Sequence, residues 1–132
     1  MSRILVVEDQ PDVLEILAEG LRDAGYEVLC ASTAARAREI LLSETVDLLL
    51  SDWILGSESG RSLGDRASQL GIPSILTTGD PARLAAATEA TFPLLAKPFR
   101  LAELQELVAR TLAVAAAEAE TRTPSAPEDR PA

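Results

Sequence analysis

The sequence predicts an α/β protein in which five parallel strands form one sheet and helices cover both of its faces. Short apolar runs alternate along the chain with longer segments in which apolar residues recur at helical spacing. Strands that alternate with helices in this way pair in parallel, so the helices must lie on both faces. A length of 132 residues, 47% hydrophobic and 25% charged, suits a single domain with a substantial core.

The expected strands are apolar runs of the kind found in strands buried on both faces. In chain order they are RILVVE (3–8), YEVLCA (26–31), VDLLLSD (46–52), PSILTT (73–78) and PLLA (93–96). The single cysteine, Cys30, lies in the second run, and we expect it to be a small core residue. One cysteine also excludes an internal disulfide.

The expected helices each place apolar residues on one stripe. They are 11–24 (Leu14, Leu17, Ala18, Leu21), 33–43 (Ala37, Ile40, Leu41), 60–70 (Leu63, Ala67, Leu70), the alanine-rich 81–90, and 101–116 (Leu101, Leu104, Leu107, Val108, Leu112). Gly25 stands where a C-cap glycine would end the first helix.

The end of the chain differs in composition from the rest. We expect one domain over residues 1–116, followed by an acidic, proline-containing tail over 117–132 that is disordered. The segment AVAAAEAE can prolong the last helix, but TRTPSAPEDRPA has almost nothing to bury. We therefore expect no second, output domain.

Composition excludes several classes of function. The chain has no histidine, which rules out histidine metal sites, histidine general bases and Ser-His-Asp triads. A net charge of −9 argues against binding to nucleic acid or anionic lipid, because both require clustered basic residues. No signal peptide or membrane-spanning run is evident. We expect a cytoplasmic protein with no nucleic-acid or membrane partner.

Polar and charged residues stand where four of the five expected strands end. Glu8 and Asp9 follow the first strand, Asp52 ends the third, Thr78 ends the fourth and Lys97 follows the fifth. In open parallel sheets, ligands bind at the carboxyl ends of the strands, so these side chains should meet. Three carboxylates and one ammonium leave two negative charges, which one divalent cation would cancel. Oxygen ligands of this kind suit Mg²⁺.

Each of these residues has an ordinary structural interpretation when taken alone. Asp9 can be the N-cap of the first helix, with Pro11 in the first turn. Asp52 can be a turn aspartate, Thr78 can lie in a turn that leads to the next helix, and Lys97 can be a surface lysine. All four at predicted ends of parallel strands are much harder to explain by chance.

The sequence resembles a response-regulator receiver domain of the chemotaxis-regulator-like (CheY-like) family of two-component signalling. The matching motifs occur in family order over roughly residues 2–112: ILVVEDQPD, DLLLSDWILGSESG, PSILTTG and LLAKPF. The resemblance implies a flavodoxin-like (βα)₅ fold with strand order 2-1-3-4-5. It also implies a phosphoprotein of a phosphorelay that takes a phosphoryl group from a sensor histidine kinase or phosphotransfer protein onto Asp52. Such a protein is not an enzyme, although it has intrinsic self-phosphotransfer and autodephosphorylation.

The resemblance also assigns roles to individual residues. Asp9 and Asp52 would ligate Mg²⁺ through their carboxylates, Glu8 mostly through water, and Ile54 through its backbone carbonyl. Thr78 and Lys97 would each bind a phosphoryl oxygen. Pro98 would follow Lys97 through a cis peptide bond.

Three features depart from the family pattern. Leu94 stands where a switch aromatic is expected, and Gly56 replaces a common proline. Only 18 residues separate Thr78 from Lys97, so the fourth helix must be short. A short fourth helix, together with Thr78-Gly79 after the fourth strand, resembles the single-domain receivers that accompany variant histidine kinases.

Four functional interpretations follow. The first is a phosphoryl-accepting module that signals to an unidentified downstream protein through protein–protein contacts, with a homodimer as one option. The second is a pseudo-receiver that binds proteins without accepting phosphate. A haloacid-dehalogenase-type enzyme would need a second carboxylate at position 54, where Ile54 stands. A DNA-binding regulator fits poorly with the acidic charge.

Overall fold

The computed structural model describes residues 1–56, 58–80, 82 and 93–122. Five strands form one parallel sheet in the order β2-β1-β3-β6-β7. They are β1 (Arg3–Val7), β2 (Glu27–Ala31), β3 (Leu48–Asp52), β6 (Ser74–Thr78) and β7 (Leu94–Ala96). Because β6 and β7 are the fourth and fifth strands of this sheet along the chain, the predicted order 2-1-3-4-5 is confirmed.

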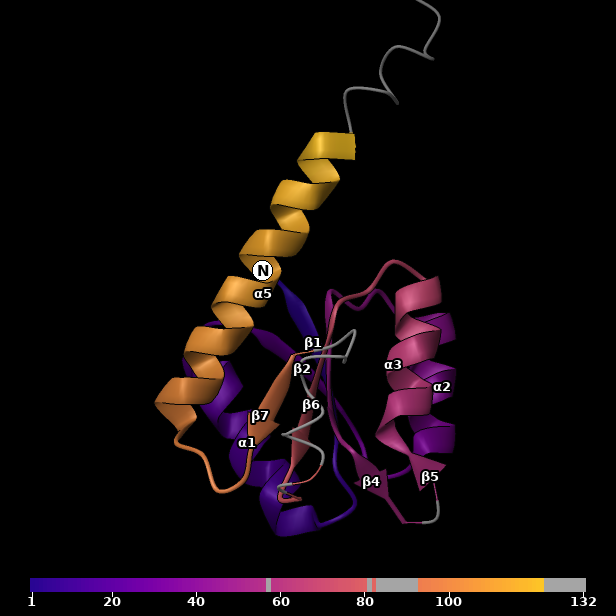
Figure 1. The fold of residues 1–132 in the computed structure, drawn as a ribbon, viewed down its shortest axis with the longest axis vertical. Helices are drawn as coiled ribbons and strands as arrows, with labels where there is room; N and C mark the ends of the chain where they lie inside the picture. Colours follow the sequence, from indigo (N-terminus) through magenta and orange to yellow (C-terminus); the bar gives the residue numbers. More distant parts are fainter. Residues whose placement is uncertain (57, 81, 83–92, 123–132) are drawn as a thin grey trace, which may run out of the picture.

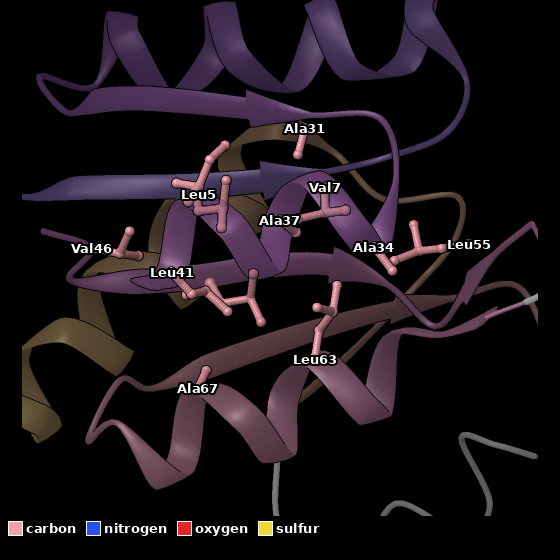
Figure 2. Close-up of a cluster of buried hydrophobic side chains, with 12 residues drawn as sticks. Leu5, Val7, Ala31, Ala34, Ala37, Leu41, Val46, Leu55, Leu63 and Ala67 are labelled. Atoms are coloured by element: carbon pink, nitrogen blue, oxygen red, sulfur yellow. The ribbon is translucent and has the colours of Figure 1, made fainter. Parts of the chain in front are cut away.

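Helices lie on both faces of the sheet (Figure 1). One face carries α1 (Pro11–Asp23) and α5 (Leu101–Arg122), and the other carries α2 (Ala34–Ser43) and α3 (Gly60–Gln69). Alternate residues of each central strand point to opposite faces, so Leu49 packs toward α2 and α3 while Leu50 packs toward α1 and α5. Figure 2 shows the core between the sheet and helices α2 and α3, with Leu63 and Ala67 of α3 facing the sheet.

Local sequence signals explain where the helices begin and end. Pro11 occupies the first turn of α1, and Gly25, with φ of 99°, follows the helix end in a conformation that favours glycine. The Thr33 hydroxyl caps α2 by accepting from the Arg36 amide, and Ser59 caps α3 in the same way. Local sequence signals therefore account for the start and end of α1 and for the starts of α2 and α3.

The structure corrects two expectations and leaves two outside its description. Cys30 is exposed rather than a core residue, because β2 is an edge strand in which this position remains open to solvent. Helix α5 continues to Arg122, so residues 117–122 of the expected tail are helical. Apart from Ala82, the predicted helix 81–90 lies outside the described residues, as do the tail residues 123–132.

Two further features concern the edge where the strands end. A two-stranded antiparallel hairpin, β4 (Ile54–Leu55) and β5 (Glu58–Ser59), follows β3 and was not predicted. The Lys97-Pro98 peptide bond is cis, as the family resemblance implies.

None of the helices in the described part of the chain has both the length and the apolar character that a membrane span requires.

Candidate functional site

Glu8 is a buried carboxylate at the end of β1. Its exposed fraction is 1%, and its backbone amide donates to the Ala31 carbonyl of β2 at 3.1 Å. Its Oε1 accepts a long 3.4 Å hydrogen bond from the Gln10 amide. Burial raises the pKa of Glu8, and the negative charge of Asp52 adds to this, while Lys97 lowers it. A group so placed is stabilised in its charged form by added positive charge.

Lys97 supplies positive charge from the other side of the site. Its Nζ donates to Asp52 Oδ2 at 3.0 Å and lies 3.6 Å from Glu8 Oε2. Burial lowers the pKa of Lys97, but the hydrogen bond and charge of Asp52, with the charge of Glu8, outweigh it and raise that pKa. Its backbone amide donates to the Thr78 carbonyl at 2.8 Å, which fixes the residue at the sheet edge.

Asp9 completes a cluster of three acids. One carboxylate oxygen from each of Glu8, Asp9 and Asp52 lies within 4.8 Å of the others. Two oxygens bound to one Mg²⁺ lie at most about 4 Å apart, so a small inward movement or a bridging water would let one ion take all three. The donor set therefore fits a hard divalent cation.

Asp9 does not act as the helix cap considered from the sequence. The N-cap of α1 is Gln10, and no side chain caps the helix there. The exposed Asp9 instead accepts a 3.3 Å hydrogen bond from the amide of Gly56, in the turn of the β4–β5 hairpin. Asp9 thus faces the site.

The segment after Asp52 folds back against the end of β3. The Trp53 amide donates to the Thr77 carbonyl at 2.8 Å, and the Gly60 amide donates to the Trp53 carbonyl at 2.6 Å. Ile54 lies in β4 and is 52% exposed. Among the described residues its carbonyl makes no hydrogen bond with the three acids, and its role as a metal ligand stays a prediction.

Thr78 lies at the same edge of the sheet, at the end of the buried strand between β3 and β7. Its hydroxyl accepts a 3.1 Å hydrogen bond from the Asp80 amide. The Asp80 carboxylate in turn accepts from the Ala82 amide at 2.9 Å. The structure therefore gathers Glu8, Asp9, Asp52 and Lys97 directly and places Thr78 one strand away.

Two residues near Asp52 escaped the sequence analysis as site components. Ser51 is fully buried, and its hydroxyl donates to the Asp52 carbonyl at 2.9 Å. Gly60 is buried and starts α3 against the same carbonyl. A serine inside an apolar strand was the available signal for the first. A glycine at the start of a helix was the signal for the second.

The arrangement favours one kind of chemistry. Three acids and one ammonium leave excess negative charge, which a bound cation would neutralise, and an anion could then approach the Asp52 carboxylate. Lys97 is already aimed at that carboxylate and can bind an oxygen of the incoming group. A phosphoryl group is such an anion.

Comparison with known proteins agrees with this geometry. A profile of the response regulator receiver domain matches residues 4–109. The response regulator receiver protein CpdR of Brucella abortus is 32% identical over 121 residues, which cover 87% of this chain and 100% of CpdR. The chain spans only 23–50% of the length of four other curated relatives that it matches.

Solved structures give the same result. A CheY-like receiver domain protein from Methanospirillum hungatei JF-1 superposes with a TM-score of 0.80 at 28% identity, covering 89% of this chain and 98% of that one. The regulator TrrA of Thermotoga maritima, solved in complex with Mg²⁺-BeF, has a TM-score of 0.74 at 29% identity, covering 84% and 99%. This chain belongs to the family of response regulator receiver domains of two-component systems.

Proposed function

We propose that this chain accepts a phosphoryl group on Asp52 in a Mg²⁺-dependent reaction and signals through protein–protein contacts. The donor would be a sensor histidine kinase or a phosphotransfer protein. The observation that carries the proposal is the Lys97 ammonium, held 3.0 Å from the Asp52 carboxylate and beside two further acids. Phosphorylation on aspartate is general to the receiver family.

The proposed metal site comprises the carboxylates of Glu8, Asp9 and Asp52 and the backbone carbonyl of Ile54. Mg²⁺ would neutralise the acids and the transferring phosphoryl oxygens. Because Glu8 is buried and its pKa is raised, it gains from a cation nearby. Asp9, whose Oδ2 accepts from the Gly56 amide, keeps its other carboxylate oxygen available to ligate the ion.

The transfer itself needs positioning more than covalent chemistry. An Asp52 carboxylate oxygen forms a bond to phosphorus while the bond from phosphorus to the donor imidazole nitrogen breaks, and that nitrogen keeps the electron pair. Lys97 would bind one phosphoryl oxygen. The Thr78 hydroxyl already accepts from the Asp80 amide, so its own proton is free to donate to another phosphoryl oxygen.

The chain would act as a signalling domain rather than as an enzyme that turns over an external substrate. Self-phosphotransfer and autodephosphorylation would both occur at Asp52. We further propose that the receiver domain extends over residues 1–116, because the described α5 side chains in the sheet core all precede position 116.

Trp53 provides the test, because it is the single tryptophan and directly follows Asp52. Mg²⁺ is titrated first and beryllofluoride, a mimic of the acyl phosphate, is added second, on the wild type and on Asp52→Asn. We expect a saturable fluorescence change with Mg²⁺ and a second change that requires Asp52. Mass spectrometry after incubation with acetyl phosphate should show one phosphoryl adduct, absent from Asp52→Asn.

The competing pseudo-receiver predicts a different outcome. A flat fluorescence signal in the wild type, with no adduct from acetyl phosphate, would reject phosphoryl acceptance and favour a binding module that does not depend on Asp52. Leu94, which replaces the switch aromatic, lies half-buried in β7. It changes how a response would be transmitted and leaves the site residues intact.

A further inference from the structure

Gly60 is a glycine because of the space around it. Its φ is negative, unlike Gly25, Gly56 and Gly71, so the backbone at this position suits any residue. A Cβ built on Gly60 would lie 2.9 Å from the carbonyl carbon of Asp52 and 2.9 Å from Ser51 Oγ, and closer still to the Asp52 carbonyl oxygen. No side chain fits there without moving the backbone of Asp52.

Three hydrogen bonds hold the backbone of Asp52 and Trp53. The Ser51 hydroxyl donates to the Asp52 carbonyl at 2.9 Å. The Gly60 amide donates to the Trp53 carbonyl at 2.6 Å, and the Trp53 amide donates to the Thr77 carbonyl at 2.8 Å. These contacts join the start of α3, the end of β3 and the neighbouring strand β6 at Asp52 and the residue that follows it, Trp53.

The same contact closes the β4–β5 hairpin. Ile54 pairs with Ser59 and Leu55 pairs with Glu58, and the bond from Gly60 to Trp53 extends this ladder by one step toward Asp52. The position of Ile54 relative to Asp52 therefore depends on how closely α3 approaches β3. The close approach is possible because Gly60 has no Cβ.

We infer that Gly60 and Ser51 are positioning residues for the chemistry of Asp52, with Gly60 setting the distance between α3 and β3 and Ser51 fixing the Asp52 backbone. The inference rests on the proposed function. A displacement of about 1 Å at a reacting group can lower a rate about 10²-fold. A methyl group at Gly60 forces a displacement at the Asp52 carbonyl itself, whose carbon is bonded directly to the Cα that bears the side chain.

A purely structural role would have a different signature. Gly60→Ala would then lower stability while a folded molecule kept its normal reactivity. Gly71→Ala is the matched control, because Gly71 has φ of 77°, has nothing within 4 Å of its Cβ position and precedes β6, at the opposite edge of the sheet from Asp52. It should lower stability through backbone strain alone.

The experiment compares wild type, Gly60→Ala, Ser51→Ala and Gly71→Ala well below their melting temperatures. It measures the initial rate of adduct formation from acetyl phosphate at saturating Mg²⁺ by mass spectrometry, and the Mg²⁺ Kd by calorimetry. We expect Gly60→Ala to react at least 10-fold more slowly and to bind Mg²⁺ several-fold more weakly. Ser51→Ala should react about 3–10-fold more slowly with Mg²⁺ Kd within twofold, and Gly71→Ala should match the wild type in both.

A folded Gly60→Ala that reacts and binds Mg²⁺ within twofold of the wild type would overturn the inference. If Gly60→Ala does not fold, Ser51→Ala decides, and a wild-type rate for it would also overturn the inference. If the wild type forms no adduct, the proposed function fails instead. The Mg²⁺ Kd of Gly60→Ala relative to Gly71→Ala then still reports whether Gly60 positions the acids.

Discussion

The Lys97 ammonium reaches the Asp52 carboxylate at 3.0 Å across an intervening strand. Lys97 follows β7, Asp52 ends β3, and β6 lies between them in the sheet. The contact is possible because parallel strands end at one edge and a lysine side chain is long enough to pass over the end of β6. Glu8, from the far side of β3, lies 3.6 Å from the same ammonium. One cation therefore links three strand ends.

Lys97→Ala separates binding of the metal from binding of the phosphoryl group. Removing the ammonium makes the cluster of acids more negative, so the Mg²⁺ Kd should stay the same or tighten slightly. Beryllofluoride should bind about 10-fold or more weakly, since a hydrogen bond to a charged group contributes roughly 1.5–3 kcal/mol. Calorimetry measures both. Arg100→Ala is the control, and equal loss of both ligands in Lys97→Ala would show that Lys97 has a structural role.

Glu8→Gln should stabilise the metal-free protein. The buried carboxylate is disfavoured in its charged form, and glutamine keeps the shape without the charge. In EDTA we expect a gain of about 1 kcal/mol, or roughly 3–6 °C in Tm. Saturating Mg²⁺ should raise the Tm of the wild type more than that of Glu8→Gln. Glu15→Gln, at an exposed acid of α1, serves as the charge control; a lower Tm in EDTA for Glu8→Gln alone would contradict the interpretation.

The metal-free protein should lose stability as the pH rises through the range in which Glu8 ionises. The pKa of Glu8 is raised in the folded state, so between the ordinary glutamate pKa and the raised value the folded state binds more protons than the unfolded state. Stability then falls with increasing pH, and the penalty is complete above the raised pKa. Urea denaturation in EDTA at several pH values measures this slope. The slope should be reduced in Glu8→Gln, and an unchanged slope would assign it to another group.

The sequence predicted correctly the features that depend on the spacing of apolar residues and on the order of strands and helices along the chain. Residues in the central strands β1 and β3 are buried toward both faces, so continuous apolar runs indicated them correctly. The same topology brings Glu8, Asp52 and Lys97 to one edge, because each follows or ends a parallel strand. The hydrogen bond between Lys97 and Asp52 depends in addition on the strand order, which the family resemblance implied and the alternation of elements alone did not.

Features set by tertiary position could not be read in this way. An apolar run does not reveal whether its strand is central or at an edge, which is why Cys30 was placed in the core. The two-residue strands of the β4–β5 hairpin are too short to show a period. The closeness of Gly60 to Asp52 depends on how α3 docks, and no local pattern encodes that distance.

Cys30 offers a direct check of its corrected position. Because the thiol is exposed on edge strand β2, it should react with a water-soluble thiol reagent in the folded protein without prior unfolding. Absorbance should show one thiol per chain reacting at a rate within about 10-fold of the rate in denaturant. Stabilising the fold with Mg²⁺ should leave that rate unchanged. A rate that falls as stability rises would mean that the thiol reacts only after opening, and would return Cys30 to the core.

Ending the chain after Ala116 tests the proposed domain boundary. The α5 side chains that are fully buried in the sheet core are Leu104 and Val108, with Leu107 and Leu112 partly buried beside them. Val114 is already 59% exposed, so little apolar surface is lost beyond that point. We expect Tm within about 2 °C of the full chain, because residues 117–119 are exposed and their removal uncovers none of the core side chains named above.

A second truncation, ending after Arg110, is the positive control for that measurement. It removes Leu112 from the core, and loss of a partly buried leucine should cost about 1–2 kcal/mol. Thermal melts followed by circular dichroism compare the three chains. If the chain ending at Ala116 loses as much stability as the one ending at Arg110, the helix beyond residue 116 contributes to the domain, and the boundary must move toward Arg122, where α5 ends.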